Sequence, residues 1–204
     1  GVRPRRPELA GIDHPKVLSY VDVLEGARPV GRRVAIIGAG GIGFDVAEFL
    51  VQESEPELAE FMAEWGVDQG YGERGGLLAQ PAAATPIREI TLLQRKAGKP
   101  GAGLGKSTGW IHRSALQMKN VTMIPGVSYH GIDDEGLHFT AGEERQVLDV
   151  DTIVVCAGQE PLRELYDAVE ATGIKTHLIG GADEAAELDA RRAIEQGFKL
   201  AIVA

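Results

Sequence analysis

The sequence predicts an α/β fold in which parallel strands form an open sheet, with an antiparallel meander inserted and a further segment at the C-terminal end. Three observations favour this fold. Short apolar runs alternate with helical patterns, which is typical of parallel strands covered on both faces. A glycine cluster directly follows the first apolar run, and turn residues divide the stretch 129–150 into short alternating segments.

The first half of the chain predicts one strand, one helix and a long excursion. Residues 1–30 are rich in proline and glycine and indicate a surface segment with a short helix at 17–24. The apolar run 34–37 predicts a buried strand. The helix after it begins inside the glycine cluster, because apolar residues then recur at helical spacing. The stretch 52–85 predicts an acidic, partly helical surface excursion, whose glutamates are Glu53, Glu55, Glu57, Glu60 and Glu64.

The second half predicts strands and helices in alternation. Buried strands are expected at 90–94, 121–124 and 152–157, with the meander at 129–150. Helices are expected at 110–118, after Pro161 and from about Leu188 to Ala201, with a short strand at 177–180. Parallel strands joined by crossover helices predict a single open sheet with right-handed connections.

The composition excludes several classes of function. The 204 residues are 44% hydrophobic and 25% charged, as in ordinary globular domains. A net charge of −9 argues against a nucleic-acid partner, and no apolar run approaches the roughly 20 residues that cross a membrane. The single cysteine, Cys156, excludes an intrachain disulfide and a multi-cysteine metal site, and its apolar neighbours predict burial. We therefore expect a cytoplasmic protein.

The glycine cluster Gly38-Ala39-Gly40-Gly41-Ile42-Gly43 lies between the predicted strand and helix, where the fingerprint G-x-G-x-x-G is meaningful. Gly38 permits a tight turn, Gly40 lets the backbone approach a pyrophosphate, and Gly43 lets the helix pack close to the sheet. Free amides at the helix start, including those of Gly41 and Ile42, favour phosphate. The alternative is a corner that needs glycine for packing alone. The pattern favours a Rossmann-like, dinucleotide-binding domain.

The end of the second strand indicates which dinucleotide is bound. NAD sites have a carboxylate there, about 20 residues past the glycines, for the ribose hydroxyls. Here the strand ends in Gln94-Arg95-Lys96, and the spacing is longer because the acidic excursion intervenes. Arg95 and Lys96 are placed to pair with a 2′-phosphate. Seven basic residues and one acidic residue lie between residues 88 and 119, which favours NADPH over the alternative of a solvated basic face.

Other candidate residues have structural interpretations as well. His112 is predicted to be a surface or capping group, and Trp65 and Trp110 are predicted to be packing anchors. The segment Lys106-Ser107-Thr108-Gly109 offers donors for a phosphate or a nicotinamide, or is a plain loop. Lys106 is the cofactor-binding candidate of this segment.

Longer stretches of the chain resemble bacterial NADPH-dependent 2,4-dienoyl-CoA reductases, which are related to the trimethylamine dehydrogenase group. The resemblance runs through nearly the whole chain. It rests on the stretches GIDHPKVLSY, AIIGAGGIGFD, LLQRKAGKPGAGLGKSTGWIHR, MIPGVSY, CAGQEP and HLIGGADEAAELDARRAIEQG. In that family an N-terminal barrel with FMN and substrate is joined to a 4Fe-4S cluster, an FAD domain, and an NADPH domain inserted in the FAD domain.

The resemblance implies three parts of this chain. Residues 1–30 would be a connecting segment from the FAD domain, 31–160 the NADPH-binding domain, and 161–204 the C-terminal portion of the FAD-binding domain. The barrel, the cluster cysteines and the first FAD glycine fingerprint are missing, so no catalytic residue is assigned. With Gly1 in place of Met, this indicates an excised or processed piece. Its partners would be NADPH and the remainder of the same polypeptide.

The resemblance also implies binding residues. Gly158 and Gln159 of CAGQEP would bind cofactor, and Asp183 in Gly180-Gly181-Ala182-Asp183 would bond the ribityl chain of FAD. The expected function is to present NADPH for hydride transfer to FAD, with FMN and the cluster in the absent region. The fragment alone is expected to be inactive. The alternative is a nucleotide-binding or docking module of an amine dehydrogenase-like flavoprotein without NADPH activity.

Overall fold

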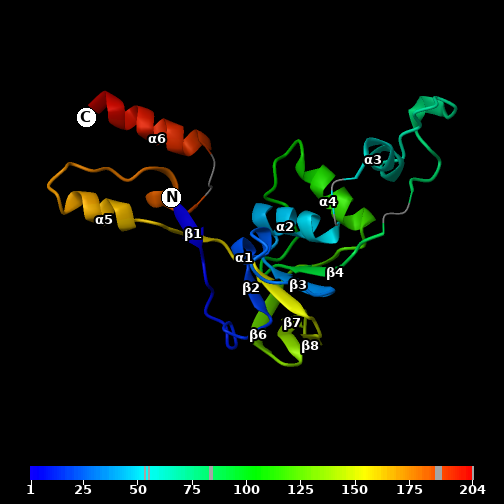
Figure 1. Cartoon of the computed structure of the whole chain (residues 1–204), viewed down its shortest axis with the longest axis horizontal. Coiled ribbons are helices and arrows are strands. Elements are labelled where there is room, and N and C mark those ends of the chain that lie inside the picture. Colours follow the sequence, from blue (N-terminus) through cyan, green and yellow to red (C-terminus); the bar gives the residue numbers. More distant parts are fainter. Residues whose placement is uncertain (53, 55, 83–84, 187–189, 204) are drawn as a thin grey trace. The chain divides into compact units, whose positions relative to one another are not determined.

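The computed structural model describes residues 1–52, 54, 56–82, 85–186 and 190–203. Two compact units are present (Figure 1). The larger unit spans residues 8–156, and the smaller unit joins residues 1–7 to residues 157–204. Glu53 and Glu55 of the predicted acidic excursion, and Leu188 at the predicted start of the last helix, lie outside the described residues.

A five-stranded parallel sheet forms the centre of the larger unit, in the order β2-β9-β3-β4-β5. Its strands are β2 (Val17–Ser19), β3 (Arg33–Ile37), β4 (Glu89–Leu93), β5 (Thr122–Ile124) and β9 (Thr152–Val155). From β3 the chain continues to β4 and β5 on one side and returns to β9 on the other. This reversal beside β3 is the switch point at which open parallel sheets bind ligands. The predicted fold class is confirmed.

Both faces of the sheet are covered, which explains the unbroken apolar runs in the strands. The helices of the larger unit are α1 (Tyr20–Leu24), α2 (Gly41–Val51), α3 (Leu58–Glu64) and α4 (Gly109–Met118), with a 3-10 turn η1 (Arg74–Gly76). In Figure 1, α2 and α4 lie on one side of the sheet and the meander lies on the other. Val34, Ile36 and Leu92 from the strands pack with Phe44 and Val46 of α2 in one buried cluster.

The predicted antiparallel meander is present as a separate three-stranded sheet. Its strands are β6 (Val127–Asp133), β7 (Gly136–Ala141) and β8 (Glu144–Leu148). The register of β6 against β7 shifts between Tyr129 and Gly131, which marks a bulge. Leu137 and Phe139 of β7 are buried, so this sheet has one apolar face.

The smaller unit contains a two-stranded sheet and two helices. Strand β1 (Val2–Pro4) pairs antiparallel with β10 (Gln159–Pro161). The chain then forms α5 (Glu164–Glu170), the 3-10 turn η2 (Gly180–Ala182) and α6 (Ala190–Val203). No helix in the described part of the chain is both long and apolar enough to cross a membrane.

Two local predictions were wrong. The helix expected at 17–24 begins only at Tyr20, because Val17–Ser19 pairs with Ile153–Val155 of β9 as an edge strand. The segment 8–30 thus contributes a strand and a helix to the larger unit. The strand expected at 177–180 does not form, because that stretch has no neighbouring strand in the described chain to share its backbone hydrogen bonds.

Candidate dinucleotide-binding site

Strand β3 turns directly into α2 through the glycine loop. Gly38 has a φ of +117°, in the region that favours glycine, and its N–H donates to the Leu93 carbonyl at 2.9 Å. Gly40 is the N-cap of α2, and its carbonyl accepts the Phe44 N–H at 3.1 Å. The loop therefore places the start of α2 at the carboxyl edge of β3 and β4, beside the switch point.

The glycines of this loop meet different surroundings. A Cβ at Gly43 would overlap the carbonyl oxygen of Gly38 and lie 3.5 Å from Leu92 Cδ1, so helix–sheet packing requires this glycine. A Cβ at Gly40 or Gly41 would have nothing within 4 Å. Gly40 has a φ of −87°, which any residue adopts. The fold itself therefore does not require glycine at these two positions, and they border open space at the helix start.

The start of α2 is electrostatically suited to an anion. No side chain among the described residues caps the helix, and its first turn contains no acidic residue. The first-turn amides, at Gly41, Ile42 and Gly43, have no partner within the helix by its geometry. Free N–H groups and the positive end of the helix dipole favour a phosphate there. The residues present fit a dinucleotide pyrophosphate, and their individual contacts remain predictions.

The turn after β4 brings two cations to the same edge of the sheet. Strands β3 and β4 are parallel neighbours, with Ile37 opposite Leu93. Arg95 and Lys96 follow this strand end, and both are exposed. Neither side chain has a hydrogen-bond or ion-pair partner within the described ranges. Two uncompensated positive charges thus lie one strand away from the glycine loop.

Tyr129 of β6 is a neighbour of Arg95 that the sequence did not single out. Its hydroxyl is buried and has no hydrogen-bond partner among the residues described. Burial raises the pKa of Tyr129, while the positive charge of Arg95 opposes that shift. The phenol is therefore neutral at physiological pH and has a donor to offer. A meander strand of this composition carries no chemical signal that marks such a residue in advance.

The loop before α4 packs against the start of α2. Gly101 has a φ of +72°, and a Cβ there would lie 2.7 Å from the Phe44 ring. Arg113 Nη1 donates to the Gly101 carbonyl at 3.0 Å. Lys106 follows in the same loop and is exposed. Further along, His112 Nδ1 lies 2.8 Å from Glu48 Oε1 and joins α4 to α2, a structural role on a half-buried face.

The other predicted cofactor residues lie in the smaller unit. The Arg5 guanidinium donates to the Ala157 carbonyl, and the Arg5 N–H donates to Gly158 O at 3.0 Å. Gly158 has a φ of +98°, and Gln159 begins β10. Asp183 Oδ2 accepts from Gln196 Nε2 of α6 at 3.0 Å. Binding by Gly158, Gln159 and Asp183 remains a prediction.

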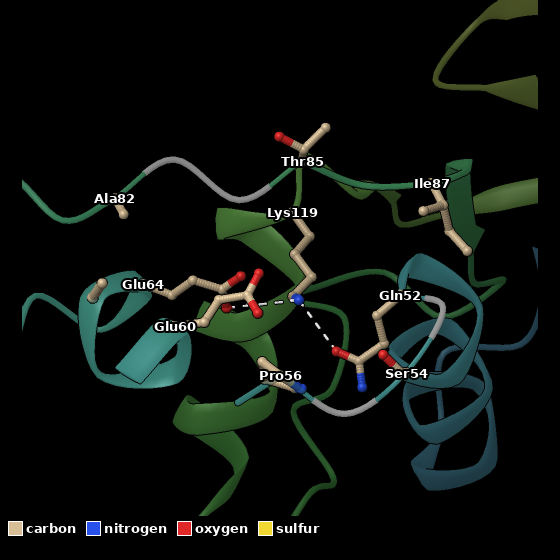
Figure 2. A pocket seen from close by; sticks show the side chains of 10 residues that line it. Gln52, Ser54, Pro56, Glu60, Glu64, Ala82, Thr85, Ile87 and Lys119 are labelled. Atoms are coloured by element: carbon tan, nitrogen blue, oxygen red, sulfur yellow. Dashed lines mark hydrogen bonds and ion pairs between the residues drawn. The ribbon is translucent and has the colours of Figure 1, made fainter. Parts of the chain in front are cut away.

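A cavity of about 350 Å³ lies at the far end of α2 (Figure 2). Lys119 Nζ donates to Gln52 Oε1 at 3.2 Å and lies 3.7 Å from Glu64 Oε2. The Lys119 and Glu64 side chains are only 12% and 11% exposed. Gln52 follows the last residue of α2, and a helix of eleven residues is about 16 Å long. The cavity therefore lies away from the glycine loop and is not part of the dinucleotide site.

Residues 1–188 match the pyridine nucleotide-disulphide oxidoreductase family. The chain belongs to this family. It is an oxidoreductase domain of the NAD(P)- and FAD-binding type. A metal reductase from Desulforamulus reducens is 26% identical over 186 residues, which cover 89% of this chain and 26% of that protein.

Solved structures of low sequence identity share the fold. The complex of 2-naphthoyl-CoA reductase with 2-naphthoyl-CoA has a TM-score of 0.71 at 22% identity, over 98% of this chain and 25% of that one. Histamine dehydrogenase from Rhizobium sp. 4-9 has a TM-score of 0.65 at 16% identity, over 98% of this chain and 29% of that one. The chain thus spans about a quarter of the length of the relatives it matches.

The disulphide chemistry in the family's name has no counterpart in this domain. Its single cysteine, Cys156, is buried beyond the end of β9. Burial raises the pKa of the Cys156 thiol to about 12, so the reactive thiolate is scarce at neutral pH. The predicted burial of Cys156 is confirmed.

Proposed function

We propose that this domain binds NADPH as the NADPH module of a 2,4-dienoyl-CoA reductase with flavin and iron–sulfur cofactors. The observation that carries the proposal is the exposed, unpaired cation pair Arg95 and Lys96 at the end of β4. No carboxylate stands in the segment 94–96, where a ribose diol would need one. NADPH, when bound, would supply a hydride to FAD.

Each part of the site has a separate task in this proposal. The free amides at the start of α2 would hold the pyrophosphate. Arg95 would bind the 2′-phosphate through two parallel N–H bonds, while Lys96 would act as a point charge beside it. Lys106 would add a further donor from the loop that packs on Phe44. Specificity between NADPH and NADH would therefore depend on residues at the end of β4 and not on the glycine loop.

The smaller unit would be the C-terminal portion of an FAD-binding domain. Asp183, held by Gln196, would bond the ribityl chain. Ile194, Phe198 and Ile202 recur every four residues along α6 and are 70%, 67% and 67% exposed. An apolar helix face of this kind needs a partner, and the remainder of the same polypeptide would cover it. The FMN and the 4Fe-4S cluster would be held in that remainder.

The acyl-CoA substrate is supported by the sequence stretches that resemble dienoyl-CoA reductases. An amine dehydrogenase-like flavoprotein without NADPH activity is the alternative, and it shares the fold. Such a module has no use for a cation pair at the end of β4, so Arg95 and Lys96 favour the reductase. Titration with NADPH separates the two, because only the reductase module binds this cofactor in preference to NADH.

Calorimetry of this chain with NADPH, NADH and FAD tests the proposal. A hydrogen bond to a charged group contributes roughly 1.5–3 kcal/mol. Arg95→Ala should therefore weaken NADPH binding about ten- to a hundredfold and leave the affinity for NADH nearly unchanged. Arg145→Ala on exposed β8 is the matched control and should alter neither. Equal losses of NADPH and NADH affinity in Arg95→Ala would overturn the 2′-phosphate assignment.

Gly40→Val tests the position of the pyrophosphate. The variant should fold, since Gly40 has ordinary φ and nothing lies near its Cβ position. Its side chain would fill the space that the pyrophosphate needs, so dinucleotide binding should disappear. Full NADPH affinity in a variant with unchanged circular dichroism and thermal unfolding would place the cofactor elsewhere.

The chain alone should not reduce a dienoyl-CoA. The relay to substrate needs the barrel and the cluster, and the first FAD glycine loop is also absent from this sequence. The assay mixes the chain with NADPH, FAD, FMN and a 2,4-dienoyl-CoA and follows nicotinamide and diene absorbance. Loss of the diene signal that depends on the protein would show that the chain has catalytic groups of its own.

A further inference from the structure

The turn that carries Arg95 and Lys96 is built around the side chain of Gln94. Gln94 Nε2 donates to the Lys96 carbonyl at 2.9 Å and to the Gly98 carbonyl at 3.1 Å. Gly98 has a φ of +95°, so the chain bends back over the amide. One side chain thus closes the turn from residue 94 to residue 98.

The backbone on both sides of this turn is also fixed. The Gln94 N–H donates to Ile124 O at 3.0 Å, and the Gln94 carbonyl accepts from Val127 N at 3.1 Å. The Lys96 carbonyl accepts a second bond, from Gly126 N at 3.1 Å. The turn is therefore held by the segment between β5 and β6, while the Arg95 and Lys96 side chains project without partners among the described residues.

The chemistry of these contacts suits an amide. Both partners are carbonyl oxygens, which only accept, so the group between them must offer two N–H donors. Glutamate has the same shape, but at neutral pH it would set a carboxylate against two carbonyl oxygens. Asparagine has the donors but is one methylene shorter. Glutamine is the uncharged side chain that reaches both carbonyls from this position.

Gln94 occupies the position that distinguishes NAD-binding from NADP-binding domains. It is the last residue before the exposed turn of the second strand, where NAD-binding domains have the carboxylate that binds the ribose hydroxyls. We propose that Gln94 is a specificity-determining positioning residue, which orders the turn so that Arg95 and Lys96 meet the 2′-phosphate and withholds a carboxylate from the ribose. This inference rests on the proposed NADPH function.

The physical effect is preorganisation. A turn that is ordered before binding does not lose conformational freedom when the phosphate binds. The cost of ordering one long side chain on binding typically corresponds to a tenfold change in affinity or less. Gln94→Ala should therefore weaken NADPH binding about tenfold and change the affinity for NADH by less than about twofold. Gln94→Glu frees the turn and adds a carboxylate near the ribose, so the ratio of the NADH and NADPH dissociation constants should fall about a hundredfold.

A double-mutant cycle separates positioning from general destabilisation. If Gln94 acts through Arg95, Gln94→Ala should weaken NADPH binding about tenfold in the otherwise wild-type chain. In the Arg95→Ala background the same substitution should change NADPH binding very little. Gln117→Glu, on the exposed face of α4, makes the same chemical change outside the site and should alter neither cofactor. Thermal unfolding of each variant reports whether it is folded.

Calorimetric titration of all variants with NADPH and NADH decides between the outcomes. A selective NADPH loss that vanishes in the Arg95→Ala background supports the inference. A wild type that prefers NADPH, combined with a Gln94→Ala variant that loses both cofactors equally or neither, overturns the role of Gln94 and leaves the proposed function standing. A wild type without NADPH preference overturns both.

Discussion

The two units of this chain differ in how far they bury their apolar side chains. In the larger unit, Val34, Ile36 and Leu92 are completely buried. In the smaller unit, Gly180 is the only buried residue that the structure describes. The larger unit therefore has the core of an independent domain, whereas the smaller unit holds together mainly through hydrogen bonds and short turns.

The same sequence pattern leads to opposite results in the two units. Helix α2 carries Val46 and Leu50 at helical spacing, and both are buried against the sheet. Helix α6 carries Ile194, Phe198 and Ile202 at the same spacing, and all three are exposed. Amphipathic spacing thus identifies a face that requires a partner but does not say whether the partner lies in the same chain.

The largest effect is expected for Leu92→Ala in the larger unit. Leu92 is completely buried in β4, so its truncation removes packing and leaves a cavity. The free energy of unfolding should fall by about 2–5 kcal/mol, measured by urea denaturation. Leu165→Ala on exposed α5 is the matched control, and its effect should stay within about 0.5 kcal/mol. Similar losses of unfolding free energy in both variants would contradict the conclusion that only the larger unit has a packed apolar core.

A smaller effect is expected for Lys119→Met at the cavity in Figure 2. The change removes the cation beside Glu64, whose side chain is 11% exposed, and leaves this carboxylate without its partner. The free energy of unfolding should fall by about 1–3 kcal/mol.

The double variant Lys119→Met, Glu64→Gln should regain part of that stability, because no unpaired charge remains. Urea denaturation of the single and double variants gives the coupling energy. Strict additivity would show that the Lys119–Glu64 ion pair contributes nothing to the coupling between α3 and the end of α4.

A pH-dependent effect is expected at the rim of the larger unit. Hydrogen bonds from Arg33 lower the pKa of Asp151 to about 2. A carboxyl whose pKa is lower in the folded state adds stability above its unfolded pKa of about 3.9, and this contribution disappears as the pH falls toward 2.

The free energies of unfolding of the wild type and Asp151→Asn should therefore differ most above pH 4 and converge below it. The pair is exposed, so the difference should also shrink with added salt. Urea denaturation between pH 2 and 6 measures both. A constant difference across this range would assign the effect of the substitution to packing.

The smallest effect on stability is expected for Phe198→Ser in the smaller unit. Phe198 is 67% exposed, so the free energy of unfolding should change by less than about 0.5 kcal/mol. Self-association at high concentration should decrease, because an apolar face is interrupted. Analytical ultracentrifugation checks this. A large loss of stability would mean that the Phe198 side chain packs inside the smaller unit.

The fold was largely predictable because its signals are local. The apolar runs of β3, β4 and β9 and the glycine loop mark a parallel sheet without reference to any other segment. The edge strand β2 was missed because three residues carry little periodicity, and they become a strand only by pairing with Ile153–Val155. Phe49 fits the helical spacing of α2 and is nevertheless 51% exposed, because the helix buries only one face.

The candidate site was predictable where the residue type itself carries the chemistry. Glycines at fixed spacing and cations at a strand end are visible in a sequence, and the structure places Gly40 and Arg95 at one sheet edge. Gln94 appeared only as the absence of a carboxylate, because its bonds to Lys96 and Gly98 depend on how the turn bends. Tyr129 was invisible for a similar reason, since a bulged meander strand brings it to Arg95.

The pairing of β2 with β9 has a consequence for the order of folding. Val17 lies opposite Ile153, so the edge strand near the beginning of the chain cannot dock until the last strand of the sheet has been made. On the ribosome, residues 17–19 must therefore wait while the glycine loop, the excursion and the meander are synthesised. Contacts between such distant segments form slowly, because a long loop must close first. The edge of the sheet that completes this domain is thus expected to be the last to assemble.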